Sequence, residues 1–282
     1  MRHPVITLAA AVLALGIPPA ARAQAPDVPL PPDVRQVGTL RHVQLKESSG
    51  LAPCRMDSKV FWTHNDGRHR ILYAIDREGH DRGSVQIMAP FEDWEDIASN
   101  SRGQLYLADT GNNKTSRTEV RVYEVDEPDP REMPRTLAVK RTWRLRFPKE
   151  VFDCESLFVW QGHGYLISKV FDDNRAGVYR FALKDEEGPV VLHRVTRLRV
   201  DSPVTGADIS RDGQKLAIVS KAGAAVFEVN GDLRTAGDVK PFWTKFRHEH
   251  IEACCFVPDG LLATAESREV YLFTAPAFRP GR

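Results

Sequence analysis

The stretch Phe91–Asn113, "FEDWEDIASNSRGQLYLADTGNN", consists of two short, partly apolar runs joined by a turn that contains glycine. Short runs of this kind, bounded by Gly, Asn, Asp and Ser, are typical of β-strands. The first run, Trp94 to Ala98, carries two adjacent carboxylates, Glu95 and Asp96. An isolated carboxylate buried in a strand would take up a proton or destabilise the fold. The stretch therefore predicts a β-hairpin in which Glu95 has a partner of positive charge.

The same pattern recurs along the chain, and the recurrence predicts the fold. Each copy has a polar residue, a short apolar run, a turn and a second apolar run that ends in a polar residue. The first polar residues of the five copies are Ser49, Glu95, Glu155, Ala207 and Glu252. A third strand follows every copy, and a fourth, more polar strand follows the first four. Repeated units of four short strands are the signature of β-propeller blades.

The two ends of the repeat region predict how the ring closes. The fifth copy ends near Thr274 without a fourth strand, whereas the N-terminal segment Arg35–Leu45, "RQVGTLRHVQL", is a strand without a blade. We therefore predict an all-β chain with a single five-bladed β-propeller of four-stranded blades over residues 35–278. Its ring is closed by the N-terminal strand, which also removes an open sheet edge. The alternatives are a six-bladed ring, which needs another inner strand, and a β-sandwich.

The first residues predict export. Residues 1–23 have a basic start, an apolar run from Val5 to Ile17 and a small-x-small site at Ala21 to Ala23, as a cleaved signal peptide does. The apolar run is too short for a membrane-spanning helix. Residues 24–34 form a Pro-rich lead-in without a core pattern. We expect a periplasmic or secreted protein; the sequence does not distinguish the two.

Composition excludes some partners and permits disulfides. The formal net charge is +1 and the hydrophobic content is 42%, as in a globular protein without bulk attraction to nucleic acid or to anionic membranes. We expect a monomer with no nucleic-acid partner. The four cysteines match no zinc motif. Strand parity and an oxidising compartment predict a Cys54–Cys254 disulfide and a free Cys154.

The inner strands predict a metal site. In a propeller, the first strand of each blade lines the central channel, so the aligned polar residues should surround the axis at one depth. Three carboxylates there would raise one another's pKa, and a hard cation would neutralise them. Oxygen ligands without Cys or His favour calcium. We therefore expect one Ca²⁺ ion, held by Ser49, Glu95, Glu155 and Glu252. The alternative is a water-filled channel with solvated acids.

Four short motifs carry a family resemblance: Ser-Gly-Leu-Ala at Ser49, Glu-Asp-Ile-Ala at Glu95, Glu-Ser-Leu at Glu155 and Glu-Ala-Cys at Glu252. They resemble the SdiA-regulated family of bacterial extracytoplasmic five-bladed propellers, whose inner strands place Ser, Glu, Glu, Ser and Glu around a calcium ion. Calcium-activated nucleotidases (apyrases) are similar in blade count and in that ring. The resemblance covers about residues 35–275 and implies an axial calcium. Ala207, where the family has Ser, is the departure, and Thr205 could compensate for it.

A second set of polar residues predicts a ligand site on the same face. The second apolar runs end at five positions that we expect to be equivalent: Asn65, Asp109, Lys169, Lys221 and Glu266. The loops that follow add polar residues, including Asp66 in "HNDGRH". Two lysines beside a metal suit a small anionic ligand such as a phosphate or a carboxylate. The alternative is that they form ordinary ion pairs with Asp109 and Glu266.

Two classes of function fit these residues. The first is a non-catalytic propeller that binds a small anionic ligand or a protein partner. The second is a calcium-dependent hydrolase, either a phosphoesterase or a lactonase. In a phosphoesterase, Lys169 and Lys221 would take developing charge and Glu266 or Asp109 would be the base. No nucleophile elbow, P-loop or zinc-protease motif occurs, and the fold alone does not decide between the classes.

Overall fold

The computed structural model describes residues 29–171, 175–200 and 203–280. The predicted signal peptide, residues 1–23, lies outside the described residues. The described chain is all β except for two short 3-10 turns, η1 (Leu233–Gly237) and η2 (Ala275–Ala277). Its described helices are far too short to cross a bilayer.

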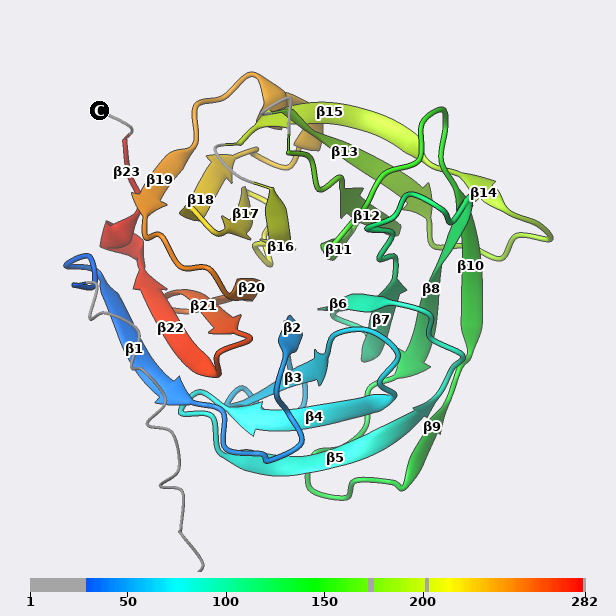
Figure 1. Ribbon diagram of the computed structural model, residues 1–282, viewed down its shortest axis with the longest axis horizontal. Helices are drawn as coiled ribbons and strands as arrows, with labels where there is room; N and C mark the ends of the chain where they lie inside the picture. Colours follow the sequence, from blue (N-terminus) through cyan, green and yellow to red (C-terminus); the bar gives the residue numbers. More distant parts are fainter. Residues whose placement is uncertain (1–28, 172–174, 201–202, 281–282) are drawn as a thin grey trace, which may run out of the picture.

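Five sheets stand around a central axis as the blades of a propeller (Figure 1). In each blade four antiparallel strands run outward from the axis. Blade 1 contains β2 (Ser48–Pro53), β3 (Val60–Asn65), β4 (Ile71–Asp76) and β5 (Asp81–Met88). Blade 2 contains β6 (Trp94–Ser99), β7 (Gln104–Asp109), β8 (Glu119–Asp126) and β10 (Arg141–Arg146). Blade 3 contains β11 (Leu157–Trp160), β12 (His163–Ile167), β13 (Arg175–Ala182) and β15 (His193–Arg199).

Blade 4 contains β16 (Val204–Ile209), β17 (Lys215–Ser220), β18 (Gly223–Glu228) and β19 (Phe242–Lys245). Blade 5 contains β20 (Ile251–Val257), β21 (Gly260–Ala265), β22 (Glu269–Thr274) and the N-terminal strand β1 (Val34–Thr39). The prediction of five four-stranded blades closed by the N-terminal strand is therefore confirmed. Strand β1 is shorter than the expected segment. It ends at Thr39, and Leu40 and Leu45 then enter the core between blades 5 and 1.

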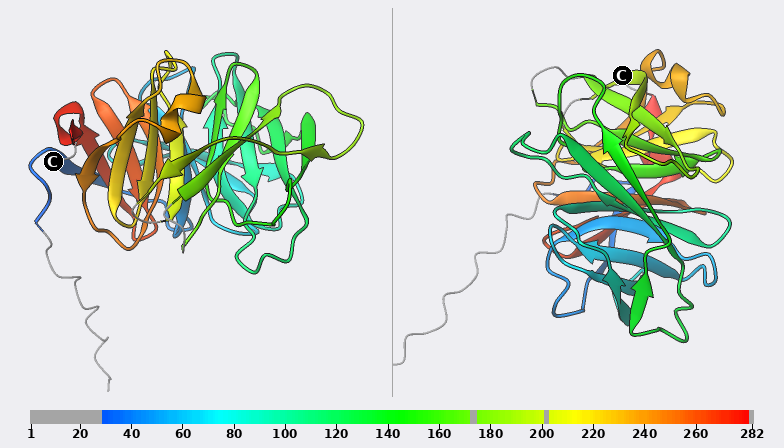
Figure 2. Two further views of the ribbon diagram at one scale, coloured as in Figure 1. Left: turned by 90° about the horizontal axis from the view of Figure 1, so that it is seen from above. Right: turned by 90° about the vertical axis from the view of Figure 1, so that its right-hand side faces the viewer.

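The core lies between the blades, because the inner strands bury side chains on both faces. Five hydrophobic clusters occur, one at each boundary between neighbouring blades. Trp62 of blade 1 and Trp94 of blade 2, both fully buried, share one cluster. The side view shows the blades as a flat ring of tilted sheets (Figure 2). The channel residues are thus fixed by packing on both sides.

The outer edge of each blade is covered by a segment from the next blade. Short strands pair with the edges of three blades: β9 (Thr136–Ala138) with β5, β14 (Val190–Val191) with β10, and β23 (Arg279–Pro280) with β19. Turn η1 packs on β15 of blade 3. The turn at Glu78 and Gly79 covers the end of β1, since the Glu78 carbonyl accepts the N–H of Thr39 at 3.2 Å. No described blade therefore presents a long open edge to other chains.

The expected Cys54–Cys254 disulfide is wrong, because all four cysteines are free and buried. Cys54 packs between blades 1 and 2, whereas Cys254 packs between blades 4 and 5. Cys54 and Cys255 lie on corresponding faces of their blades, as the alternation of side chains along the strands predicts. However, the face of blade 1 that carries Cys54 points away from blade 5, so no cysteine of blade 5 can reach it.

Candidate cation site at the channel mouth

The inner strands begin with a β-bulge, and the bulged residues form the ring of polar positions. The pairing registers skip Ser49 in blade 1, Glu95 in blade 2, Thr205 in blade 4 and Glu252 in blade 5. Glu155 lies at the corresponding place just before β11. A bulge leaves the extra residue unpaired and re-aims its side chain. The structure thus brings the four predicted metal ligands to one end of the channel.

The alignment of blade 4 on Ala207 is wrong. Ala207 pairs with Ile218 within the strand and packs in the core between blades 3 and 4. Thr205 takes the ring position, so the ring reads Ser, Glu, Glu, Thr, Glu. The two hydroxyls have similar contacts: Ser49 donates to the carbonyl of Glu95 at 2.7 Å, and Thr205 donates to that of Ile251 at 2.9 Å. Both hydroxyls therefore tie an inner strand to the next blade.

Asp96, which follows Glu95, points away from the ring and joins two blades. Its Oδ1 accepts the N–H of Ile97 at 2.7 Å, and its Oδ2 accepts the N–H of Leu157 in blade 3 at 2.6 Å. Asp208 repeats the arrangement between blades 4 and 5, where its Oδ2 accepts the N–H of Phe256 at 2.8 Å. These buried carboxylates thus hold inner strands together.

Three carboxylates converge next to the channel. One oxygen each of Asp66, Asp93 and Glu95 lies within 4.8 Å of the others. A β-bridge brings them together across the blade boundary, since Trp94 and Gly67 exchange backbone hydrogen bonds of 2.8 and 3.2 Å. The motifs of the inner strands did not indicate Asp93, which lies before the strand. Asp66 was expected only as part of a ligand loop.

Gly111 forms one wall of this carboxylate group. An added Cβ there would lie 2.1 Å from Oε1 of Glu95 and 2.3 Å from Oδ2 of Asp93. The loop cannot easily move away, because Arg117 Nη1 donates to the Gly111 carbonyl at 2.7 Å and the Gly111 N–H donates to the Asp93 carbonyl at 3.2 Å. Only glycine leaves this space between the two carboxylates free.

Burial and mutual repulsion raise the pKa of Glu95, Asp66, Glu155 and Glu252. Burial raises the pKa of Glu95 well above its ordinary value, and the carboxylates of Asp66 and Glu155 raise it further. The pKa of Asp66 rises to about 6 through burial and then through Asp93. Burial raises that of Glu155 to about 7 and that of Glu252 to about 8. The channel mouth therefore favours protons or another cation.

Lys169 neutralises one side of this region. Its ammonium forms an ion pair with Glu155, and both side chains are largely buried. The same ammonium lowers the pKa of Glu252. By contrast, the strongest neighbours of Glu95 are all carboxylates. The acids therefore divide into a lysine-balanced part, Glu155 and Glu252, and a second part, Asp66, Asp93 and Glu95. In the second part burial keeps the pKa of Asp93 above its ordinary value, although Arg117 and Arg68 lower it.

The expected pairing of the lysines with Asp109 and Glu266 is wrong for Lys169. Asp109 is fully buried and instead lies 3.2 Å from Arg117 Nη2. Its Oδ1 also accepts the N–H groups of Glu92 and Asp93, at 3.1 and 2.8 Å, and so positions Asp93. Glu266 lies 3.3 Å from His250.

The five expected ligand positions are not equivalent. Asn65 and Asp109 end their strands opposite the residue before the bulge. In blades 4 and 5 that place belongs to Ser220 and Ala265, so Lys221 and Glu266 each lie one residue further on. Lys169 instead forms an isolated antiparallel β-bridge with Asp153 through its backbone. Asn65 holds a loop, since its Oδ1 accepts from the N–H groups at 46 and 47 at 2.7 and 3.0 Å.

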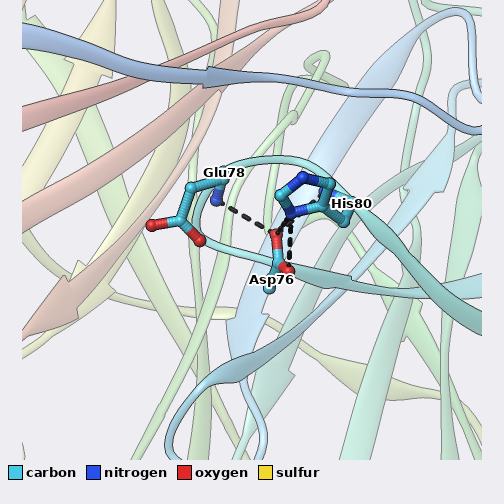
Figure 3. A group of neighbouring side chains, drawn as sticks. All are labelled: Asp76, Glu78 and His80. Carbon is cyan, nitrogen blue, oxygen red and sulfur yellow. Dashed lines mark hydrogen bonds and ion pairs between the residues drawn. The ribbon is translucent and has the colours of Figure 1, made fainter.

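A second acidic group lies in the turn between β4 and β5 and has a local structural role. Figure 3 shows hydrogen bonds converging on the carboxylate of Asp76, whose Oδ1 accepts the N–H groups of Glu78 and His80 at 3.1 and 2.9 Å. Nδ1 of His80 lies 2.9 Å from its Oδ2. The Asp76 carboxylate thus braces the hairpin turn.

Comparison with known proteins shows likeness to solved structures only. No family model matches the sequence, and no curated protein matches it. A chain in the crystal structure of the mitotic checkpoint complex is 14% identical with a TM-score of 0.42, covering 87% of this chain and 67% of that one. Hydrazine synthase of Kuenenia stuttgartiensis is also 14% identical with a TM-score of 0.42, covering 81% and 58%. Membership of the SdiA-regulated family stays a prediction.

Proposed function

We propose that this chain is an exported propeller that binds one calcium ion at the mouth of its channel and a small anionic ligand beside it. The observation that carries the proposal is the convergence of Asp66, Asp93 and Glu95 without a lysine or arginine among the strongest neighbours of Glu95. The motif resemblance to extracytoplasmic calcium-binding propellers supports both the ion and the exported location.

The donor chemistry supports calcium. All three side chains offer oxygen, which is the ligand type that calcium prefers, and ligand distances of about 2.4 Å separate opposite oxygens by about 4.8 Å. Oδ1 of Asp66 is buried and has no hydrogen-bond partner among the described residues. Of the ligands expected from the repeat, the proposed site keeps Glu95. It adds Asp66 and Asp93 and leaves out Glu155, whose carboxylate forms an ion pair with Lys169.

The anionic ligand is proposed to bind at the other part of the channel mouth, where Glu155 and Glu252 lie. Lys169 lies there with the ring of Phe171, 5.9 Å from its ammonium, and Phe171 is 69% exposed. A carboxylate or phosphate bound to the calcium could also meet this ammonium. The hydrolase alternative gains no comparable support, since the carboxylate of Asp109 is buried among backbone N–H groups and Arg117.

Calorimetry on chelator-treated protein tests the calcium site. We expect one calcium ion per chain, and we expect Asp66→Asn to weaken its affinity at least tenfold, about 1.4 kcal/mol, because a charged ligand is lost. Asp76→Asn is the matched control, because it alters the other acidic group, and should leave the affinity unchanged. Absence of calcium binding, or equal effects of the two variants, would overturn the proposal. Activity assays on phosphoesters, nucleotides and lactones, with and without calcium, test the hydrolase alternative.

A further inference from the structure

A hollow of about 350 Å³ lies at the boundary of blades 3 and 4. It is at the far end of β11 from Glu155, so it shares no residue with the channel mouth. Its lining includes Trp160, Tyr165, Arg180, His193 and the segment 231–234 that leads into η1. Hollows of this size accommodate small organic molecules.

Two aromatic side chains form fixed walls of this hollow. The ring of Trp160 packs so closely on Gly213 that an added Cβ there would lie 2.0 Å from it. The ring of Tyr165 stacks on Phe158, with centroids 5.0 Å apart and an interplanar angle of 2°. Because Trp160 packs on Gly213 and Tyr165 stacks on Phe158, both rings offer rigid, flat apolar surfaces to a ligand.

Arg180 gives the hollow a positive charge that no lining acid balances. It pairs across the sheet with Tyr165 on one side and with His193 on the other. Asp232 is the acid in the lining, and it is already bound by Arg234, with Nε and Nη2 at 2.8 and 2.7 Å from its two oxygens. The guanidinium of Arg180 forms a side-chain hydrogen bond with Tyr165. Among the described residues it has no ion pair, so its other N–H groups can bind an added anion.

A second hollow, of about 190 Å³, has Arg180 and His193 in common with the first. Its other lining includes Phe181 and Val191, and Val191 is 58% exposed. Arg180 thus lines both a hollow of mixed polar and aromatic character and a smaller, mainly apolar one, which is where the charged group of a larger ligand would lie.

We infer that this pair of hollows binds a small organic anion, in which an oxyanion meets Arg180 and an attached flat ring lies against Trp160 and Tyr165. The guanidinium is planar and matches a carboxylate or a phosphate through two parallel hydrogen bonds. The site is separate from the proposed calcium site and does not depend on it.

Binding of simple probes tests the inference. Benzoate and phenyl phosphate carry both required groups, whereas neutral benzamide lacks the charge and inorganic phosphate lacks the ring. We expect one of the two ring anions to bind at least tenfold more tightly than either control compound. Arg180→Gln should weaken that binding at least tenfold, and Arg194→Gln, a matched loss of charge on the same blade, should not change it.

Tryptophan fluorescence provides a second readout. Trp62, Trp94 and Trp143 are buried, and of the two half-buried tryptophans, Trp160 and Trp243, Trp160 lines the hollow. The probe should change the emission of the wild type, and Trp160→Phe should remove that change while calorimetry still detects binding. A chelator or Asp66→Asn should leave the affinity unaltered. Absence of saturable binding, equal binding of benzamide, or an unaltered affinity in Arg180→Gln would overturn the inference, whatever the outcome at the calcium site.

Discussion

At the scale of the residue, Gly111 gives the sharpest test of the cation site. In Gly111→Ala the new methyl group would occupy the space between Glu95 and Asp93. We expect the calcium affinity to fall at least tenfold, because two carboxylates must turn aside, a change of about 1.4 kcal/mol or more in binding free energy. Calorimetry measures the affinity.

The matched control is Gly188→Ala, since an added Cβ at Gly188 meets no atom within 4 Å. In chelator both variants should melt close to the wild type, because at Gly111 only the ends of flexible side chains have to move. A Gly111→Ala protein that binds calcium like the wild type would show that the ion, if present, lies elsewhere.

Two of the three carboxylates of the site could not be predicted from the sequence, because they meet only in the folded ring. Glu95 was predictable, because it repeats in register with Glu155 and Glu252. Asp66 and Asp93 lie outside that register, and they meet through the Gly67–Trp94 bridge between two blades. No pattern within one blade indicates such a bridge.

At the scale of the element, Asp96 is predicted to stabilise the junction of blades 2 and 3. Asp96→Asn would replace one acceptor oxygen by an NH2 group that cannot accept, leaving the N–H of either Ile97 or Leu157 without its partner. An unsatisfied buried donor costs about 1–3 kcal/mol. Urea denaturation should show a loss of that order in the free energy of unfolding.

Asp212→Asn is the control for this experiment, because Asp212 lies in an exposed turn of blade 4. If Asp96→Asn unfolds at the same urea concentration as the control, Asp96 does not stabilise the junction.

The strands and their order were predictable from the sequence, but the exact register was not. Short apolar runs between Gly- and Asp-rich turns identify strands, and a surplus N-terminal strand with an incomplete fifth blade indicates closure. A β-bulge adds one residue without changing the composition of the strand. The composition of blade 4 therefore does not reveal that its bulge lies at Thr205, two residues before Ala207.

At the scale of the whole molecule, the clustered acids predict an unusual dependence of stability on pH. The folded-state pKa values of about 6 for Asp66, about 7 for Glu155 and about 8 for Glu252 lie above those of an unfolded chain, near 4. Between about pH 5 and 8 the folded state therefore binds more protons than the unfolded state. Without calcium, the free energy of unfolding should fall as pH rises, by up to about 1.4 kcal/mol per pH unit for each group.

Thermal melts at several pH values, with chelator and with calcium, measure this dependence. Calcium should flatten it, because a bound cation favours the ionised carboxylates, and Glu252→Gln should flatten the part near pH 8. A chelated protein that becomes more stable from pH 5 to pH 8 would contradict the prediction.

The pairing of β1 with β22 also has a consequence for the order in which the molecule can be built. Residues 34–39 leave the ribosome before any blade exists, yet their partners, residues 269–274, are made only after the four strands of each of blades 1 to 4. The ring consequently stays open until β22 has been made, and blade 5 becomes complete only when β1 pairs with it. Contacts between such distant segments slow folding, since the loop-closure entropy is lost before they form. Until then β1 is a strand without a neighbour, which a chaperone could bind.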